Sequence, residues 1–200
     1  MPKVLLESIR VGALLVPLLL VLAVEHSWAE TSDADELLAL LSEDDYFALI
    51  RHALAPGTGD PEQFEVDDCR TQRNLDGAGR RQAMTMGQRL RDAGITQALV
   101  YSSQWCRCLE TAELLAIGPV IPLPSLNSFF QARHRAETQT TELKSWLSEQ
   151  PLDLPTVLST HQVNITALTD VFPNSGEILI VYRDADNNYQ LVGSVVTAIE

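Results

Sequence analysis

The sequence of 200 residues predicts an α/β protein, a three-layer α/β/α sandwich around a mostly parallel, mixed sheet with an antiparallel C-terminal edge hairpin. Two observations predict this fold. Short apolar runs alternate with longer helical segments, which is typical of parallel strands joined by crossover helices. The last two apolar runs, 178–182 and 189–195, are separated instead by a turn sequence, Asp186-Asn187-Asn188, which favours a hairpin.

Strands are expected where apolar residues cluster between turn residues. The first run, Tyr46 to His52, is apolar and ends in two polar residues, as does a buried strand that leads into a functional loop. The other strands are expected at 98–101, at 156–160 and in the two hairpin segments, with a short one in the Pro-punctuated segment 119–124.

Helices are expected between these strands. Asp76 is a candidate N-cap for a helix over 77–93 that ends at Gly94. The hydroxyls of Ser102 and Ser103 are expected to cap the next helix, which runs to about residue 116. The other helices are expected at 30–45 (entered at Ser32 or Asp33), 137–149 and 164–170.

The segment 53–75, called the long loop below, is rich in Gly, Pro, Asp and Gln. A loop of this length inside one domain is often functional. We expect its first part, as far as Arg73, to form the rim of a substrate site together with residues 129–137, which mix aromatic and basic side chains.

Residues 1–29 are predicted to be a signal peptide and residues 30–200 the domain. Lys3 and Arg10 make the start positive, Val11 to Val24 is uncharged and mostly apolar, and Ser27-Trp28-Ala29 offers small residues for cleavage. The apolar run is shorter than the roughly 20 residues that a membrane-spanning helix needs. We therefore expect a periplasmic or secreted protein without a membrane span after cleavage; an uncleaved anchor is the alternative.

The formal net charge of -13 argues against binding to the phosphate backbone of DNA or RNA. The basic residues are nevertheless all arginine except Lys3 and Lys144. Arginine binds planar oxyanions through two hydrogen bonds at once, which lysine does not.

The three cysteines, Cys69, Cys106 and Cys108, allow at most one intramolecular disulfide. Cys106 and Cys108 lie two apart on a predicted helix, so their side chains diverge, and Cys69 is expected to pair with one of them. Their spacing lacks the paired knuckles of a zinc site. No cysteine is followed by an arginine six residues later, which excludes the Cys-x5-Arg loop of cysteine phosphatases.

Two histidines indicate a site. His52 and His161 each lie where a predicted buried strand stops, and His52 follows Arg51. Ligands of open α/β sheets bind beyond the carboxyl ends of the strands, so this pair is better explained by a site than by core packing. A third strand end carries Ser102-Ser103-Gln104-Trp105-Cys106-Arg107, whose hydroxyls, helix N-terminus and guanidinium suit an anion.

These motifs, in this order, resemble the histidine phosphatase superfamily, also called phosphoglycerate-mutase-like. The Arg-His signature of the first strand corresponds to Leu49-Ile50-Arg51-His52-Ala53. The Leu-x-x-x-Gly-x-x-Gln-Ala helix start corresponds to 75–83, and Ser-Ser followed by Arg and Thr-Ala corresponds to 102–112. The late strand that ends in His corresponds to 158–161, so the resemblance spans residues 46–170.

The resemblance implies that His52 attacks phosphorus and carries a phosphohistidine. Arg51, Arg107 and His161 are then expected to bind the phosphoryl oxygens, which agrees with the dependence of phosphoryl transfer on positioning and charge compensation. No cofactor and no metal ion is expected, because the arginines supply the positive charge. The residues expected to bind substrate besides these are Ser102, Ser103 and Asn74.

The sequence departs from the family at the proton donor. Many members place an acid in the stretch that corresponds to 126–130, and others place one directly after the late histidine, where this chain has Gln162. Either another carboxylate folds into the site, or the leaving group needs little protonation, as in an aryl phosphate, an acyl phosphate or phosphohistidine. Small members that act on phosphohistidine also lack the acid. The candidate carboxylates are Asp60, Glu62, Glu65 and Glu137.

The function expected is therefore that of an exported phosphatase that hydrolyses phosphomonoesters or phosphoramidates, with a small-molecule or envelope phosphate as substrate and with slow turnover of simple alkyl phosphates. A non-catalytic phosphate-binding relative is the alternative, but binding alone does not require the nucleophile His52. A mutase is disfavoured by the missing acid and by the signal sequence.

Overall fold

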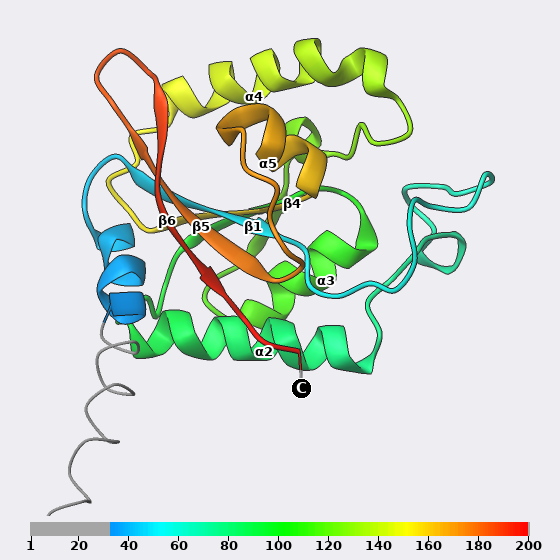
Figure 1. The fold of residues 1–200 in the computed structure, drawn as a ribbon, viewed down its shortest axis with the longest axis horizontal. Helices are drawn as coiled ribbons and strands as arrows, with labels where there is room; N and C mark the ends of the chain where they lie inside the picture. The colour runs from blue at the N-terminus through cyan, green and yellow to red at the C-terminus, as the bar shows by residue number, and fades with distance from the viewer. Residues whose placement is uncertain (1–32, 200) are drawn as a thin grey trace, which may run out of the picture.

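Residues 33–199 are described by a computed structural model, and the predicted signal peptide lies outside them. They form one six-stranded sheet with helices on both faces (Figure 1). The strands are β1 (Tyr46–Arg51), β2 (Leu99–Ser102), β3 (Val120–Pro122), β4 (Thr156–Thr160), β5 (Glu177–Arg183) and β6 (Tyr189–Val196). Their order across the sheet is β3-β2-β4-β1-β5-β6.

The sheet is mixed, as predicted. Parallel pairs join β1 to β4, β4 to β2 and β2 to β3, whereas β5 is antiparallel to β1 and forms the C-terminal hairpin with β6. The carboxyl ends of β1, β2 and β4 therefore lie at one edge of the sheet. There the His52 N–H donates to the Thr160 carbonyl at 2.9 Å, and the Ser103 N–H donates to the Ser159 carbonyl at 2.9 Å.

The helices are residues 33–39, α2 (Gly77–Asp92), α3 (Cys106–Leu115), α4 (Ala136–Glu149) and α5 (Gln162–Thr169). The predicted cap of α2 is confirmed, because the Asp76 side chain accepts the Gly79 N–H at 2.7 Å. The predicted cap of α3 is wrong: Ser102 ends β2, and α3 begins only after Trp105. Within residues 33–199, no helix is long and apolar enough to cross a membrane.

Two apolar cores lie on opposite faces of the sheet, because successive residues of a strand point to opposite sides. From β1, Ala48 and Ile50 pack in the core that includes side chains of α2 and α3. Phe47 and Leu49 pack in the core that includes side chains of α4 and α5. Figure 1 shows these helix pairs on opposite sides of the sheet, which confirms the three-layer arrangement.

The start of the long loop is held against α2 by two residues of the second sequence motif. Gly79 packs so closely that an added Cβ would lie 1.9 Å from the Leu54 carbonyl oxygen. The Gln82 side chain accepts the Leu54 N–H at 2.9 Å and donates to the Ser175 and Thr197 carbonyls at 2.9 and 2.8 Å. These contacts fix the backbone directly after Arg51 and His52.

Candidate active site

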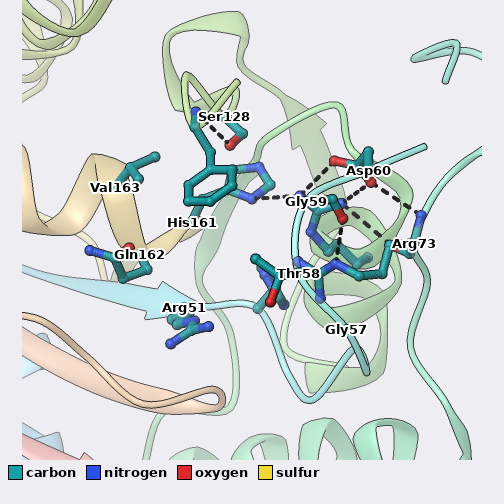
Figure 2. Close-up of a pocket in the computed structure, with 13 residues that line it drawn as sticks. Arg51, Gly57, Thr58, Gly59, Asp60, Arg73, Ser128, His161, Gln162 and Val163 are labelled. Carbon is teal, nitrogen blue, oxygen red and sulfur yellow. Dashed lines mark hydrogen bonds and ion pairs between the residues drawn. The ribbon is translucent and has the colours of Figure 1, made fainter. Parts of the chain in front are cut away.

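A pocket that opens to solvent lies at the carboxyl ends of β1 and β4. The four residues predicted to be catalytic all line it: Arg51, His52, Arg107 and His161. The rest of the lining comes from residues 57–60 and Arg73 of the long loop, and from Ser128, Phe130, Gln162 and Val163. In Figure 2, Asp60 and Arg73 lie together on one side of the pocket, and Arg51 and Gln162 lie on the other.

The ring of His52 is buried, with 2% of the residue exposed, and its orientation is fixed by the residue that follows it. Its Nδ1 lies 2.8 Å from the Ala53 carbonyl oxygen. A carbonyl can only accept, so Nδ1 carries the hydrogen and Nε2 keeps its lone pair. Burial, and then the charges of Arg107, Arg73 and Arg51, hold the pKa of His52 well below 6.5. The ring therefore stays neutral near pH 7, with a nucleophilic nitrogen.

His161 begins a chain of hydrogen bonds behind the pocket. Its ring lies edge-on to that of His52, with 5.5 Å between the centroids. Its Nδ1 is 3.4 Å from an Arg107 Nη, which can only donate, so the hydrogen lies on Nε2 and is directed to the Ser103 hydroxyl at 2.8 Å. That hydroxyl donates to Asn127 Oδ1 at 3.3 Å. Burial and the nearby charge of Arg107 hold the pKa of His161 well below 6.5.

Three guanidinium groups line the pocket. Arg51 donates to the Pro173 carbonyl at 2.8 Å. Arg73 donates to the Gly59 carbonyl at 2.8 Å and to the Ala55 carbonyl. Burial and the charge of Arg107 lower the pKa of both Arg51 and Arg73 from the ordinary arginine value, but both stay protonated near neutral pH. Their mutual repulsion makes the pocket a site that a bound anion would stabilise.

Asp60 is the carboxylate within this arginine cluster. It forms an ion pair with Arg107 at 2.7 Å, and each of the two side chains is 3% exposed. Burial raises the pKa of Asp60, but the hydrogen bond and charge of Arg107, together with hydrogen bonds from Arg73 and Trp105, outweigh burial and lower it overall from 3.8. Asp60 is therefore ionised at neutral pH and holds no proton for a leaving group.

Several residues singled out in the sequence do not line the pocket. The Ser102 hydroxyl donates to the Ser103 carbonyl at 2.8 Å, and the Asn74 amide donates to the Cys69 carbonyl at 2.5 Å. Ser103 acts through His161, and its use there explains why it does not cap α3. Three of the four candidate proton donors also lie outside the pocket lining, namely Glu62, Glu65 and Glu137.

Sequence reasoning placed Arg73 in the expected substrate rim but missed its place among the arginines that line the pocket. It lies 22 positions after Arg51 in a loop without periodicity, so no strand end or helix start marked it as a site residue. The one available signal was the high proportion of arginine among the basic residues.

A disulfide joins the long loop to α3. Cys69 pairs with Cys106, which directly precedes Arg107, and Cys108 is free and buried. The Gln72 side chain reinforces this junction by accepting the Cys106 N–H at 3.0 Å. The predicted pairing of Cys69 with a cysteine of this helix is thus confirmed, and Cys106 is the partner.

The sequence profile of the histidine phosphatase superfamily (branch 1) matches residues 47–150. The matched segment contains Arg51, His52 and Arg107 and ends before His161. No curated protein matches the chain.

Solved structures share the fold. The protein histidine phosphatase SixA, complexed with tungstate, is 16% identical with a TM-score of 0.53, covering 75% of this chain and 96% of that one. A candidate phosphohistidine phosphatase SixA from Agrobacterium tumefaciens is 18% identical with a TM-score of 0.52, covering 76% and 97%. The mycobacterial glucosyl-3-phosphoglycerate phosphatase Rv2419c, in complex with inorganic phosphate, is 14% identical with a TM-score of 0.55, covering 78% and 98%.

Proposed function

Because the chain belongs to the histidine phosphatase superfamily, we propose that it is a phosphatase that hydrolyses phosphomonoesters or phosphoramidates through a phosphohistidine on His52. One observation carries this proposal. The bond from His52 Nδ1 to the Ala53 carbonyl leaves the Nε2 lone pair free, in a pocket also lined by three arginines. A neutral imidazole beside positive charge is the arrangement that attack on a phosphoryl dianion needs.

In the first step, Arg51, Arg73 and Arg107 bind the phosphoryl oxygens and compensate their charge. His52 Nε2 forms a bond to phosphorus while the bond from phosphorus to the leaving oxygen or nitrogen breaks. The electron pair of that bond goes to the leaving group, which takes a proton from solvent. The hydrogen on Nδ1 stays in place, held by the Ala53 carbonyl.

In the second step, water adds to phosphorus and the N–P bond breaks. This releases dihydrogen phosphate and returns His52 to its starting tautomer. His161 assists by protonation: a bound phosphoryl dianion offsets the charge of Arg107, which raises the pKa of His161. The protonated ring can then donate from Nδ1 to a phosphoryl oxygen, in place of the hydrogen bond that Nδ1 accepts from Arg107 in this structure.

The leaving group is expected to need little protonation. Among residues 33–199, Asp60 is the one carboxylate that lines the pocket, and it is ionised. Aryl phosphates, acyl phosphates and phosphohistidine release leaving groups that tolerate this, whereas simple alkyl phosphates do not. The name of SixA, protein histidine phosphatase, supports the phosphoramidate class by fold analogy.

We further propose that the enzyme is exported and acts in the periplasm or outside the cell, on a small-molecule or envelope phosphate. The charge and apolar pattern of residues 1–29 supports export. The Cys69–Cys106 disulfide also supports it, because disulfides persist in oxidising compartments. N-terminal sequencing of the protein recovered from the periplasm or medium tests this part, and a chain that begins at Met1 in the cytoplasm would contradict it.

The catalytic proposal is tested with residues 30–200 and 4-nitrophenyl phosphate, without added metal and with a chelator present. We expect wild-type turnover to survive the chelator and to be lost in His52→Ala and strongly reduced in His161→Ala. Glycerol phosphate serves as the alkyl comparison and should react far more slowly. Folded wild-type protein that binds vanadate but turns over none of these substrates would instead support the non-catalytic binding protein.

A further inference from the structure

We propose that Asp60 is a positioning residue for Arg107 and takes no part as proton donor. This inference rests on the proposed function for its kinetic test, but its binding test does not need turnover. The geometry that carries it is a carboxylate enclosed by donors from three different side chains or backbone groups, at the wall of the phosphoryl pocket.

Both oxygens of Asp60 are fully engaged. Oδ1 accepts from Arg107 Nη1 at 2.7 Å and from the Arg73 backbone N–H at 3.1 Å. Oδ2 accepts from Arg107 Nη2 at 3.2 Å and from the indole N–H of Trp105 at 3.0 Å. A carboxylate with its acceptor positions filled in this way is held in one orientation, and the paired contacts to Arg107 fix the plane of the guanidinium.

The ion pair with Asp60 does not use the Nε–H donor of Arg107. Its Nε is buried and has no hydrogen-bond partner within residues 33–199. A buried donor without a partner is unfavourable, and because Arg107 lines the pocket, a bound phosphoryl oxygen that reaches this nitrogen would satisfy it. Asp60 therefore occupies the terminal nitrogens of Arg107 and keeps the Nε–H edge available for substrate.

Asp60 also adjusts the charge of the pocket. Of the residues that the structure describes, three arginines and one carboxylate line the pocket, and with both histidines neutral their net charge is two positive units. A phosphomonoester dianion carries two negative charges, so the cluster matches its ligand. Without Asp60, the three guanidinium groups would repel one another without compensation and would spread apart.

A proton donor and a positioning residue respond differently to the leaving group. Loss of a donor harms esters in proportion to the basicity of the leaving group and leaves 4-nitrophenyl phosphate almost unaffected. Loss of a positioning residue harms all substrates alike, because it acts on the phosphoryl oxygens. The experiment therefore compares Asp60→Asn with wild type on 4-nitrophenyl phosphate and phenyl phosphate. Glu62→Gln, at an exposed carboxylate of the same loop, is the matched control.

We expect kcat to fall by about tenfold or more in Asp60→Asn, by the same factor for both esters, with no change in Glu62→Gln. The binding test compares vanadate, a mimic of the transition state, with inorganic phosphate. Removing a negative charge strengthens both anions alike, so their affinity ratio isolates positioning. We expect the preference for vanadate to fall about tenfold in Asp60→Asn.

A second variant guards against loss of folding. Trp105→Phe keeps an aromatic ring and the charge of Asp60 but removes one donor to Oδ2, so we expect a smaller change in the same direction. An unchanged vanadate-to-phosphate ratio in the folded variants would overturn the inference. So would a kcat loss confined to phenyl phosphate, which would make Asp60 the donor. If wild type turns over neither ester, the proposed function fails while the anion ratio still tests Asp60.

Discussion

The two sides of the pocket are built in different ways. Arg51, His52 and His161 lie at the ends of β1 and β4, where the pairing of buried parallel strands sets their positions. Asp60 and Arg73 lie on the long loop, which has no strand or helix of its own except the 3₁₀ turn η2 (Cys69–Thr71). The strand side holds the nucleophile on the most rigid part of the fold. On the loop side, polar contacts and one disulfide hold the charged side chains of Asp60 and Arg73 in place.

The two sides of the pocket are therefore expected to respond differently to substitution. Core strands open only with global unfolding, whereas a loop held by polar contacts opens at lower cost. We therefore expect changes on the strand side to remove chemistry in a folded protein, and changes on the loop side to alter stability and anion binding together.

The largest effect is expected from the strand side, in His52→Ala. Loss of the nucleophile should lower kcat by at least about 1000-fold. The circular dichroism spectrum, and the thermal stability measured without vanadate, should stay close to those of wild type. His134→Ala is the matched control, because His134 is exposed and does not line the pocket. Residual activity within tenfold of wild type would show that the strand side does not supply the nucleophile.

The next effect concerns the loop side, in the double variant Cys69→Ser/Cys106→Ser. The disulfide spans 37 positions, and chain entropy alone predicts a loss of about 3–4 kcal/mol in the free energy of unfolding. Urea denaturation measures it. We expect phosphate affinity to fall as well, because Cys106 adjoins Arg107. Dithiothreitol should reproduce both effects in wild type and add nothing to the variant; equal stability of all these samples would contradict the role given to the loop.

The pH dependence of stability should separate the two sides. The pKa values of His52 and His161 are lowered by burial and by Arg107, so between pH 6.5 and their folded pKa values only the unfolded chain takes up these protons. The contribution of these two histidines to the free energy of unfolding is therefore fully present above about pH 6.5. Below that pH the free energy of unfolding falls, by up to about 1.4 kcal/mol per pH unit for each histidine. The Asp60 contribution is lost in the same direction but at lower pH: its folded pKa lies below 3.8, so the contribution is present above about that pH and is lost only as the pH falls further.

Urea midpoints measured from pH 8 to pH 5 test this prediction. A flat stability profile over this range in wild type would contradict the neutral, buried state of the two pocket histidines.

The smallest effect is expected for Ser103→Ala. This change removes the partner of the His161 Nε2 hydrogen and leaves that buried donor poorly satisfied, which costs about 1–2 kcal/mol. We expect kcat to fall about tenfold, since His161 would no longer be held in one orientation. Ser102→Ala, whose hydroxyl donates to a neighbouring carbonyl away from the pocket, is the control for kcat. Equal kcat values in the two variants would exclude the proposed role of Ser103.

The strand side was predictable from sequence because its signals are local. An apolar run that stops at Arg51-His52, and another that stops at His161, places these residues at one edge of a parallel sheet. The cap at Asp76 was predictable for the same reason, since N-cap and N–H lie within one turn. The cap at Ser103 failed because a distant side chain, His161, competes for its hydroxyl.

The loop side was not predictable to the same degree. Nothing in the spacing of Asp60, Arg73 and Arg107 indicates that they meet, because the chain between them follows polar contacts that have no periodicity. The choice of Cys106 over Cys108 was likewise open. The orientation of the two side chains decides the pairing. The Cys108 Sγ is buried 3.6 Å from the Thr160 carbonyl oxygen, whereas Cys106 forms the disulfide with Cys69 of the long loop.

Detection of the phosphoenzyme tests directly whether His52 carries the phosphoryl group. Wild-type protein is mixed with an excess of 4-nitrophenyl phosphate, quenched in alkali, which preserves phosphohistidine, and analysed by peptide mass spectrometry. We expect an acid-labile phosphoryl group on the peptide that contains His52, and none in His52→Ala. Steady turnover by His52→Ala, or a phosphoryl group on any other residue of a turning-over enzyme, would contradict it.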